Sequence, residues 1–108
     1  ADGQIFAEGW NFGPHDEDAR PVQWIVEHMV DVWGNRASWQ LDGGSHPHEA
    51  NYLKLDISKA KAKLAWQPRW DLAKALASIT DWHQHWIAKS DVQNKCLLQI
   101  NDYQNTIA

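Results

Sequence analysis

Apolar side chains recur at helical spacing in three stretches of this 108-residue chain. The first stretch begins at Pro21, which suits the first turn of a helix because proline has no amide hydrogen to leave unsatisfied. It ends at Gly34, since glycine readily adopts the left-handed conformation that closes many helices. The i, i+3, i+4, i+7 rule predicts one packed stripe between them, formed by Val22, Ile25, Val26, Met29, Val30 and Trp33.

A short helix and two longer ones are predicted in the second half of the chain. Ser58 is expected to cap a short helix over residues 59–65, and Asp71 to cap a helix that runs to about Lys89. Ser90 or Asp91 then begins a last helix, whose weaker packing potential favours contact with a partner. The predicted packed faces are Leu72, Ala75, Leu76, Ile79, Trp82 or His83, and Trp86, then Val92, Cys96, Ile100 and Tyr103.

Short alternating stretches predict strands between the helices. Trp10 and Phe12 would share one face of an extended piece over residues 8–13, and residues 38–41 and 52–55 are further candidates. Pieces this short do not easily make an independent sheet. The sequence therefore predicts one domain over residues 1–108 that is mainly α with a few short β-strands, an α+β fold class.

The densest set of chemically capable side chains lies in residues 41–56. Two glycines and a proline impose an irregular backbone there, and such loops commonly present binding groups. Three interpretations stay open: a metal site, a solvated loop, or a binding loop for an anionic or sugar-containing ligand. The metal site is the weakest, because Pro47 separates the histidines and the spacing matches no established zinc pattern. The side chains concerned are Asp42, His46, His48 and Glu49.

Composition and charge narrow the possible partners. A net charge of −4 argues against bare nucleic acid, which usually needs a basic face. Cys96 is the single cysteine, so no internal disulfide forms, as is typical of a reducing cytoplasm. No apolar run reaches membrane-spanning length and no signal peptide opens the chain, so we expect a cytoplasmic protein without a membrane partner. The eight tryptophans fit helix packing better than sugar stacking.

Familiar catalytic motifs do not occur. There is no G-x-S-x-G elbow, no G-x-G-x-x-G turn and no Walker-type phosphate loop, so we assign no catalytic residue. His15 with Asp16 could orient a ligand, although an acidic loop ahead of a helix is the commoner role, because a helix N-terminus favours carboxylates. His83 is expected to pack inside and His85 to lie on the surface.

Several short strings are distinctive when taken together. They are W-N-F-G-P from residue 10, W-Q-L-D-G-G from residue 39, H-P-H-E-A from residue 46, Y-L-K-L-D from residue 52 and W-Q-P-R-W from residue 66. This set resembles the C-terminal part of the CDP-glucose 4,6-dehydratases, a branch of the extended short-chain dehydrogenase/reductase family of nucleotide-sugar enzymes. The likeness extends over nearly the whole chain, from about residue 8 to residue 103.

The resemblance implies an isolated C-terminal substrate-binding lobe with no Rossmann domain. Full-length members hold NAD in that other domain, so we expect no cofactor in this chain. A Tyr-x-x-x-Lys pair does the redox chemistry in the family, and neither Tyr52 nor Tyr103 has a lysine at that spacing. We therefore expect a truncated nucleotide-sugar dehydratase lobe that is inactive alone.

The resemblance also implies where a CDP-sugar would bind. Residues 42–52 contain no arginine to match the family's diphosphate-binding one, so we expect weak binding. The alternative is a free-standing self-associating interaction module, because a detached lobe exposes apolar surface; a homo-oligomer is expected. By position, the substrate-binding residues would be His15 and Asp16 near the nucleotide, His48 and Glu49 near the ribose and diphosphate, and Asn51 and Tyr52 supporting that loop.

Overall fold

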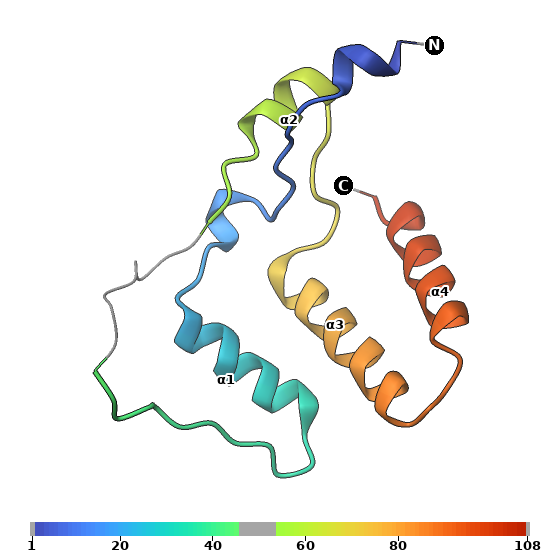
Figure 1. The fold of residues 1–108 in the computed structure, drawn as a ribbon. Helices are drawn as coiled ribbons and strands as arrows, with labels where there is room; N and C mark the ends of the chain where they lie inside the picture. Colours follow the sequence, from blue (N-terminus) through green and yellow to red (C-terminus); the bar gives the residue numbers. More distant parts are fainter. Residues whose placement is uncertain (1, 46–53, 108) are drawn as a thin grey trace.

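Helices make up all the regular structure that the computed structural model describes, which covers residues 2–45 and 54–107. Two short 3-10 turns precede the first long helix, and the chain then ends in three further helices (Figure 1). The elements are η1 (Gly3–Phe6), η2 (Asp16–Asp18), α1 (Val22–Trp33), α2 (Ser58–Leu64), α3 (Leu72–Ile87) and α4 (Val92–Asn105).

The prediction of an α+β fold is wrong, because the described residues contain no strand. Around Trp10 and Phe12 the backbone is irregular, and the two rings contact other side chains and backbone instead of a neighbouring strand. The Trp10 indole N–H donates to the Phe6 carbonyl at 2.9 Å, and Phe12 meets Trp66 edge to face with ring centroids 5.0 Å apart. Residues 38–41 are irregular as well. A strand needs a hydrogen-bonding neighbour, and sequence alternation alone does not supply one.

Local capping chemistry sets the helix ends. The Asp71 carboxylate accepts from the Lys74 amide at 2.8 Å, so the predicted cap of α3 is confirmed. Of the two predicted starts of the last helix, Asp91 is the cap, because its carboxylate accepts from the Asn94 amide at 3.0 Å. Gly34 ends α1 with a φ of 70°, a region that glycine enters without strain. The Ser58 cap was misplaced by one residue, because Ser58 is itself helical and Ile57 holds the cap position. The Asp56 carboxylate accepts from the Ser58 amide at 2.9 Å just ahead of the helix.

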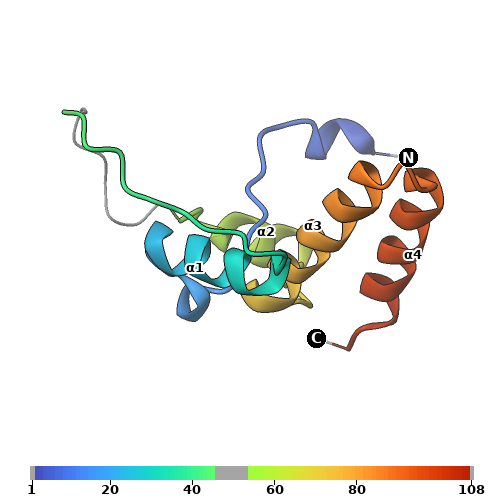
Figure 2. The ribbon, with the colours of Figure 1, turned by 90° about the horizontal axis from the view of Figure 1, so that it is seen from below.

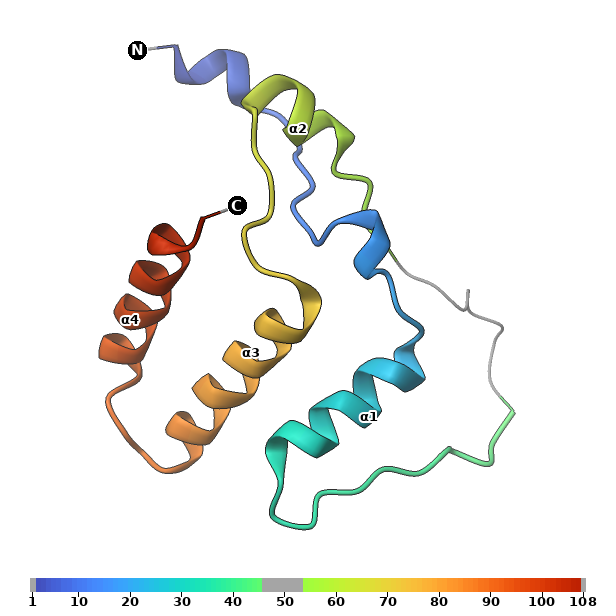
Figure 3. The same ribbon diagram turned by 180° about the vertical axis from the view of Figure 1, so that it is seen from behind.

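Three helices form a single layer with α3 in the middle. Figures 1 and 3 show α3 lying between α1 and α4, and Figure 2, seen from below, keeps the same order. On α3, Leu76 and Thr80 are buried and share a face with Gln84, whose amide donates to the Trp33 carbonyl of α1 at 3.0 Å. This face of α3 is therefore the one turned toward α1.

The predicted packed face of α3 is wrong at several positions. Ile79 is 48% exposed and Trp86 is 59% exposed, so this part of the apolar stripe does not enter the interior. The two histidines are reversed relative to the prediction. His83 is exposed, whereas His85 is half-buried with its Nδ1 2.8 Å from the Asp81 carbonyl oxygen. Periodicity identified the apolar stripe but not the side of the helix that finds a neighbour.

A second, smaller packing unit joins the N-terminal arm to α2. Ile57 and Ala60 are buried, and Gly13 lies so close to the chain at Leu55 that a Cβ there would stand 3.6 Å from the Leu55 Cβ. Lys59 secures the arm from outside, because its Nζ donates to the Gly9 carbonyl at 2.7 Å. We call this cluster, with Phe12 and Trp66, the arm unit.

The chain exposes much more surface than a compact protein of its mass. Its accessible surface is 8720 Å², against roughly 6,100 Å² expected for a compact 12.4 kDa monomer. The radius of gyration is 17.0 Å, against about 13 Å for a compact domain of this length. Residues 2–45 and 54–107 thus do not form the two-layer arrangement that usually encloses a core. None of the helices described is both long and apolar enough to cross a bilayer.

Candidate functional site

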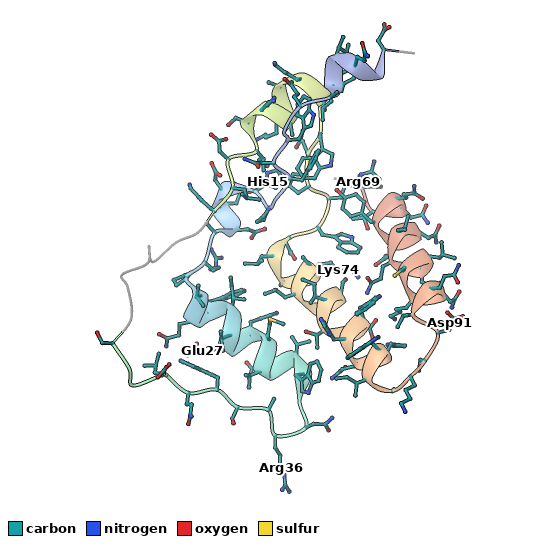
Figure 4. The ribbon with its side chains drawn as sticks, viewed as in Figure 1. His15, Glu27, Arg36, Arg69, Lys74 and Asp91 are labelled. Atoms are coloured by element: carbon teal, nitrogen blue, oxygen red, sulfur yellow. The ribbon has the colours of Figure 1, made fainter. Side chains whose placement is uncertain are left out.

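The turn at His15–Asp18 meets the chain where residues 54–58 lead into α2. The Asp16 carboxylate lies 3.9 Å from the Lys54 ammonium, and both side chains are exposed. An exposed pair at this distance is screened by water and adds little stability. The ion pair is informative because it shows that the end of the polar loop over residues 41–56 lies beside the turn that precedes α1. Figure 4 labels His15 at this junction.

Two small cavities lie on either side of this turn. His15 and Asp16 line both of them, one of about 240 Å³ and one of about 160 Å³. Ligand pockets usually hold about 300–1,000 Å³, so neither cavity encloses a nucleotide-sugar by itself. The larger is also lined by Pro14, Asp18, Ala19, Arg20, Ile25, Lys54, Leu55 and Leu72, and the smaller by Glu17, Asp56, Ile57, Ser58 and Lys61.

Acidic and basic side chains both line the larger cavity, and two of them, Asp18 and Arg20, already form hydrogen bonds within the protein. The Asp18 carboxylate accepts from the Leu72 amide at 3.1 Å, so it ties η2 to the start of α3. The Arg20 guanidinium donates to the carbonyls of Glu17 at 3.0 Å and Ala19 at 3.2 Å, which holds its planar group at the cavity edge. Arg20 and Lys54 can therefore offer donors to an anion, because a guanidinium has five N–H groups and an ammonium has three.

The smaller cavity contains a carboxylate with an altered acidity. The hydroxyl and the backbone amide of Ser58 both donate to Asp56, and this holds the pKa of the Asp56 carboxyl below its usual value. Hydrogen bonds that favour the charged form act in this direction. Asp56 consequently stays ionised near neutral pH and works as an acceptor, which suits a cap for α2 or a hydroxyl partner better than a proton donor.

The structure brings together some of the predicted site residues. His15 and Asp16 lie side by side at the two cavities, whereas His48, Glu49, Asn51 and Tyr52 fall outside the described residues. The question of a metal at the histidine loop stays open for the same reason. Within residues 2–45 and 54–107, no group of three or more His, Cys, Asp or Glu side chains could hold a metal ion.

Sequence reasoning missed the two cations at the larger cavity. Arg20 lies before α1, outside the loop over residues 42–52 where an arginine was expected, and it reaches the cavity only through the fold. Lys54 was noted only as part of a family string. Lys54 lies within one of the strings that carry the resemblance, so its charge was a usable signal, whereas Arg20 lies outside those strings.

Comparison with known proteins supports one relationship. No protein-family model matches the chain. The chain is 53% identical over 104 residues, 96% of its length, to CDP-glucose 4,6-dehydratase of Salmonella typhimurium, and it spans 29% of the length of that enzyme. The matching region is the C-terminal part of the enzyme, so the resemblance seen in the short strings is confirmed.

Proposed function

We propose that this chain is a truncated nucleotide-sugar dehydratase lobe that positions a CDP-sugar and does not transform it. The observation that carries the proposal is the 53% identity to the C-terminal part of a CDP-glucose 4,6-dehydratase. The catalytic steps of such a reaction would belong to the part of the relative that this chain does not span. Positioning alone supplies orientation for a reaction and no bond chemistry.

The surroundings of His15 and Asp16 have the groups that such a ligand would need. A diphosphate accepts hydrogen bonds, and Arg20 and Lys54 carry donors at the edge of one cavity. A ribose or glucose hydroxyl donates, and the Asp16 carboxylate can accept from it. The cavities are small and exposed, which supports weak binding when the chain is alone.

Calorimetry with CDP-glucose and a coupled NAD assay test this proposal directly. We expect weak binding and no turnover by the purified chain. Lys54→Ala should weaken binding by roughly tenfold or more, because a charge-assisted hydrogen bond contributes about 1.5–3 kcal/mol. Lys63→Ala is the matched control, since Lys63 is similarly exposed on α2 and lines neither cavity. Turnover by the chain, or equal affinity in both variants, would contradict the proposal.

A second candidate is a self-associating interaction module, and the exposed apolar surface favours it. The chain has about 40% more accessible surface than a compact monomer of its mass should have, and large apolar side chains of α3 and α4 are exposed. Sedimentation velocity over a range of concentrations should detect dimers or larger species. A single monomeric species at every concentration would refute self-association and leave CDP-sugar binding untouched.

A further inference from the structure

The apolar stripes of α3 and α4 point to the same side of the helix layer. The Trp82 indole N–H of α3 donates to the Cys96 sulfur of α4 at 3.2 Å, so these two positions adjoin. Near the other end of the pair, Ala75 of α3 and Tyr103 of α4 line one cavity. We define the α3–α4 face as the side of the layer that carries Ala75, Ile79, Trp82, Trp86, Cys96, Ile100 and Tyr103.

Further polar contacts join α3 to α4 alongside these stripes, in which Ile79, Trp86 and Ile100 are exposed. The Lys74 ammonium lies 2.9 Å from the Asp102 carboxylate, and Lys95 pairs with Asp81. The Gln99 amide donates to the Ser78 carbonyl at 2.8 Å. The two helices contain four Lys, Arg, Asp and Glu residues, and all four are in these two pairs. The α3–α4 face therefore has no Lys, Arg, Asp or Glu of its own.

A groove of about 620 Å³ opens on this face. It is lined mainly by the apolar surfaces of Trp70, Ile100 and Tyr103, with Cys96 and glutamine side chains at its edge. Arg69 also borders it, but the Arg69 guanidinium donates to the Gln104 carbonyl at 2.8 Å at the end of α4, where Figure 4 labels it. The positive charge of Arg69 is thus directed at the helix end, which favours cations.

We propose that the α3–α4 face binds the same face of a second copy of this chain. The inference rests on the proposed self-association and names the surface that serves it. Two copies related by a two-fold axis would bring two uncharged faces together, so no unpaired charge would be buried. An acidic partner, in contrast, would meet only Arg69 at the edge of the groove, and the Arg69 guanidinium already donates to the Gln104 carbonyl. The second layer would also supply the missing cover for the apolar stripes.

The dimensions of the face suit a stable dimer. Helices of 16 and 14 residues are about 24 and 21 Å long, and two packed side by side are about 20 Å wide. The planar area is then roughly 500 Å², and the relief of the side chains raises the accessible area above that value. Standard protein interfaces bury about 800 Å² per partner, which is the same order.

A pair of matched variants on α4 tests the face. Ile100 and Leu98 are each 54% exposed, but positions two apart on a helix project about 200° from one another, so Leu98 lies off the face. In sedimentation equilibrium, Ile100→Asp should raise the dimer dissociation constant at least tenfold, whereas Leu98→Asp should leave it within about twofold. Circular dichroism of both variants checks that the helices are retained.

Thiol chemistry at Cys96 gives a second readout that needs no substitution. Cys96 is exposed in the single chain and lies on the face, so its reaction with a disulfide reagent should slow severalfold at concentrations where dimers form. Equal reactivity in monomer and dimer would place the interface elsewhere and overturn the inference. Loss of the dimer in Leu98→Asp but not in Ile100→Asp would overturn it too. Either of these two results would leave self-association itself intact. A chain that is monomeric at every concentration would refute both self-association and the α3–α4 interface.

Discussion

The arm unit and the α3–α4 pair are held together by opposite means. In the arm unit Ile57 and Ala60 are buried, and the polar Lys59 contacts lie outside. Between α3 and α4 there are two ion pairs, the Gln99 amide hydrogen bond and the Trp82–Cys96 hydrogen bond, while the apolar Ile79 and Ile100 are exposed. Apolar burial stabilises without a partner of matching geometry, while polar contacts fix the register and add little free energy. The arm unit should therefore be the more strongly stabilised region for its size.

The largest expected difference between the two regions appears when an isoleucine in each is shortened to alanine. Ile57→Ala should lower the free energy of unfolding by about 2–4 kcal/mol, because it leaves a cavity in a buried site. Ile79→Ala, at a 48% exposed position, should lower it by less than about 1 kcal/mol in the monomer. Urea unfolding at concentrations below dimer formation measures both. Equal losses of unfolding free energy in the two variants would contradict the view that apolar burial stabilises the arm unit more than the α3–α4 pair.

The cap of α3 should have an intermediate effect. Asp71→Ala removes the carboxylate that accepts from the Lys74 amide, and caps of this kind contribute about 1 kcal/mol. Asp71→Asn keeps an acceptor oxygen and should retain most of the stability. The free energies of unfolding of the two variants, measured under identical conditions, decide the point, and a loss as large in Asn as in Ala would contradict the capping role.

The ion pairs between α3 and α4 should contribute less. A double-mutant cycle on Lys74 and Asp102, both about half exposed, should give a coupling free energy of about 0.2–1 kcal/mol. The coupling should shrink in 1 M salt, because the screening length falls to about 3 Å. A larger coupling free energy that persists in salt would contradict the view that the α3–α4 contact is weaker than the arm unit.

Acidification should act on the arm unit through Asp56. The pKa of the Asp56 carboxyl is lowered in the folded chain by its hydrogen bonds to Ser58, so the cap is complete above the usual aspartate range. Its contribution is lost as the pH falls through that lowered pKa, because protonation removes the charged acceptor. The amide signal of Ser58 in NMR should shift in the same pH range. Asp56→Asn should show no such titration.

Local chemistry explains which parts of the fold the sequence predicted well. Asp71, Asp91 and Gly34 each act on the residues beside them, so the ends of α1, α3 and α4 could be located from the sequence to within about two residues. The prediction of a strand at Trp10 and Phe12 was wrong because a strand depends on a partner strand that is distant in the sequence. Of the predicted site residues, His15 and Asp16 lie together at both cavities, whereas Arg20, which was not predicted, reaches the larger cavity only through chain packing.

By itself, the sequence determined where the helices run and which stripes are apolar. It also showed the resemblance to the C-terminal part of a CDP-glucose 4,6-dehydratase, which the 53% identity confirms. Only the tertiary structure decided which stripes face a neighbour. The physical reason is that helical periodicity depends on residues three and four apart, whereas the neighbour of a stripe depends on how separate helices assemble. In α3 the interior received Leu76 and Thr80, and Ile79 and Trp86 were left on the surface.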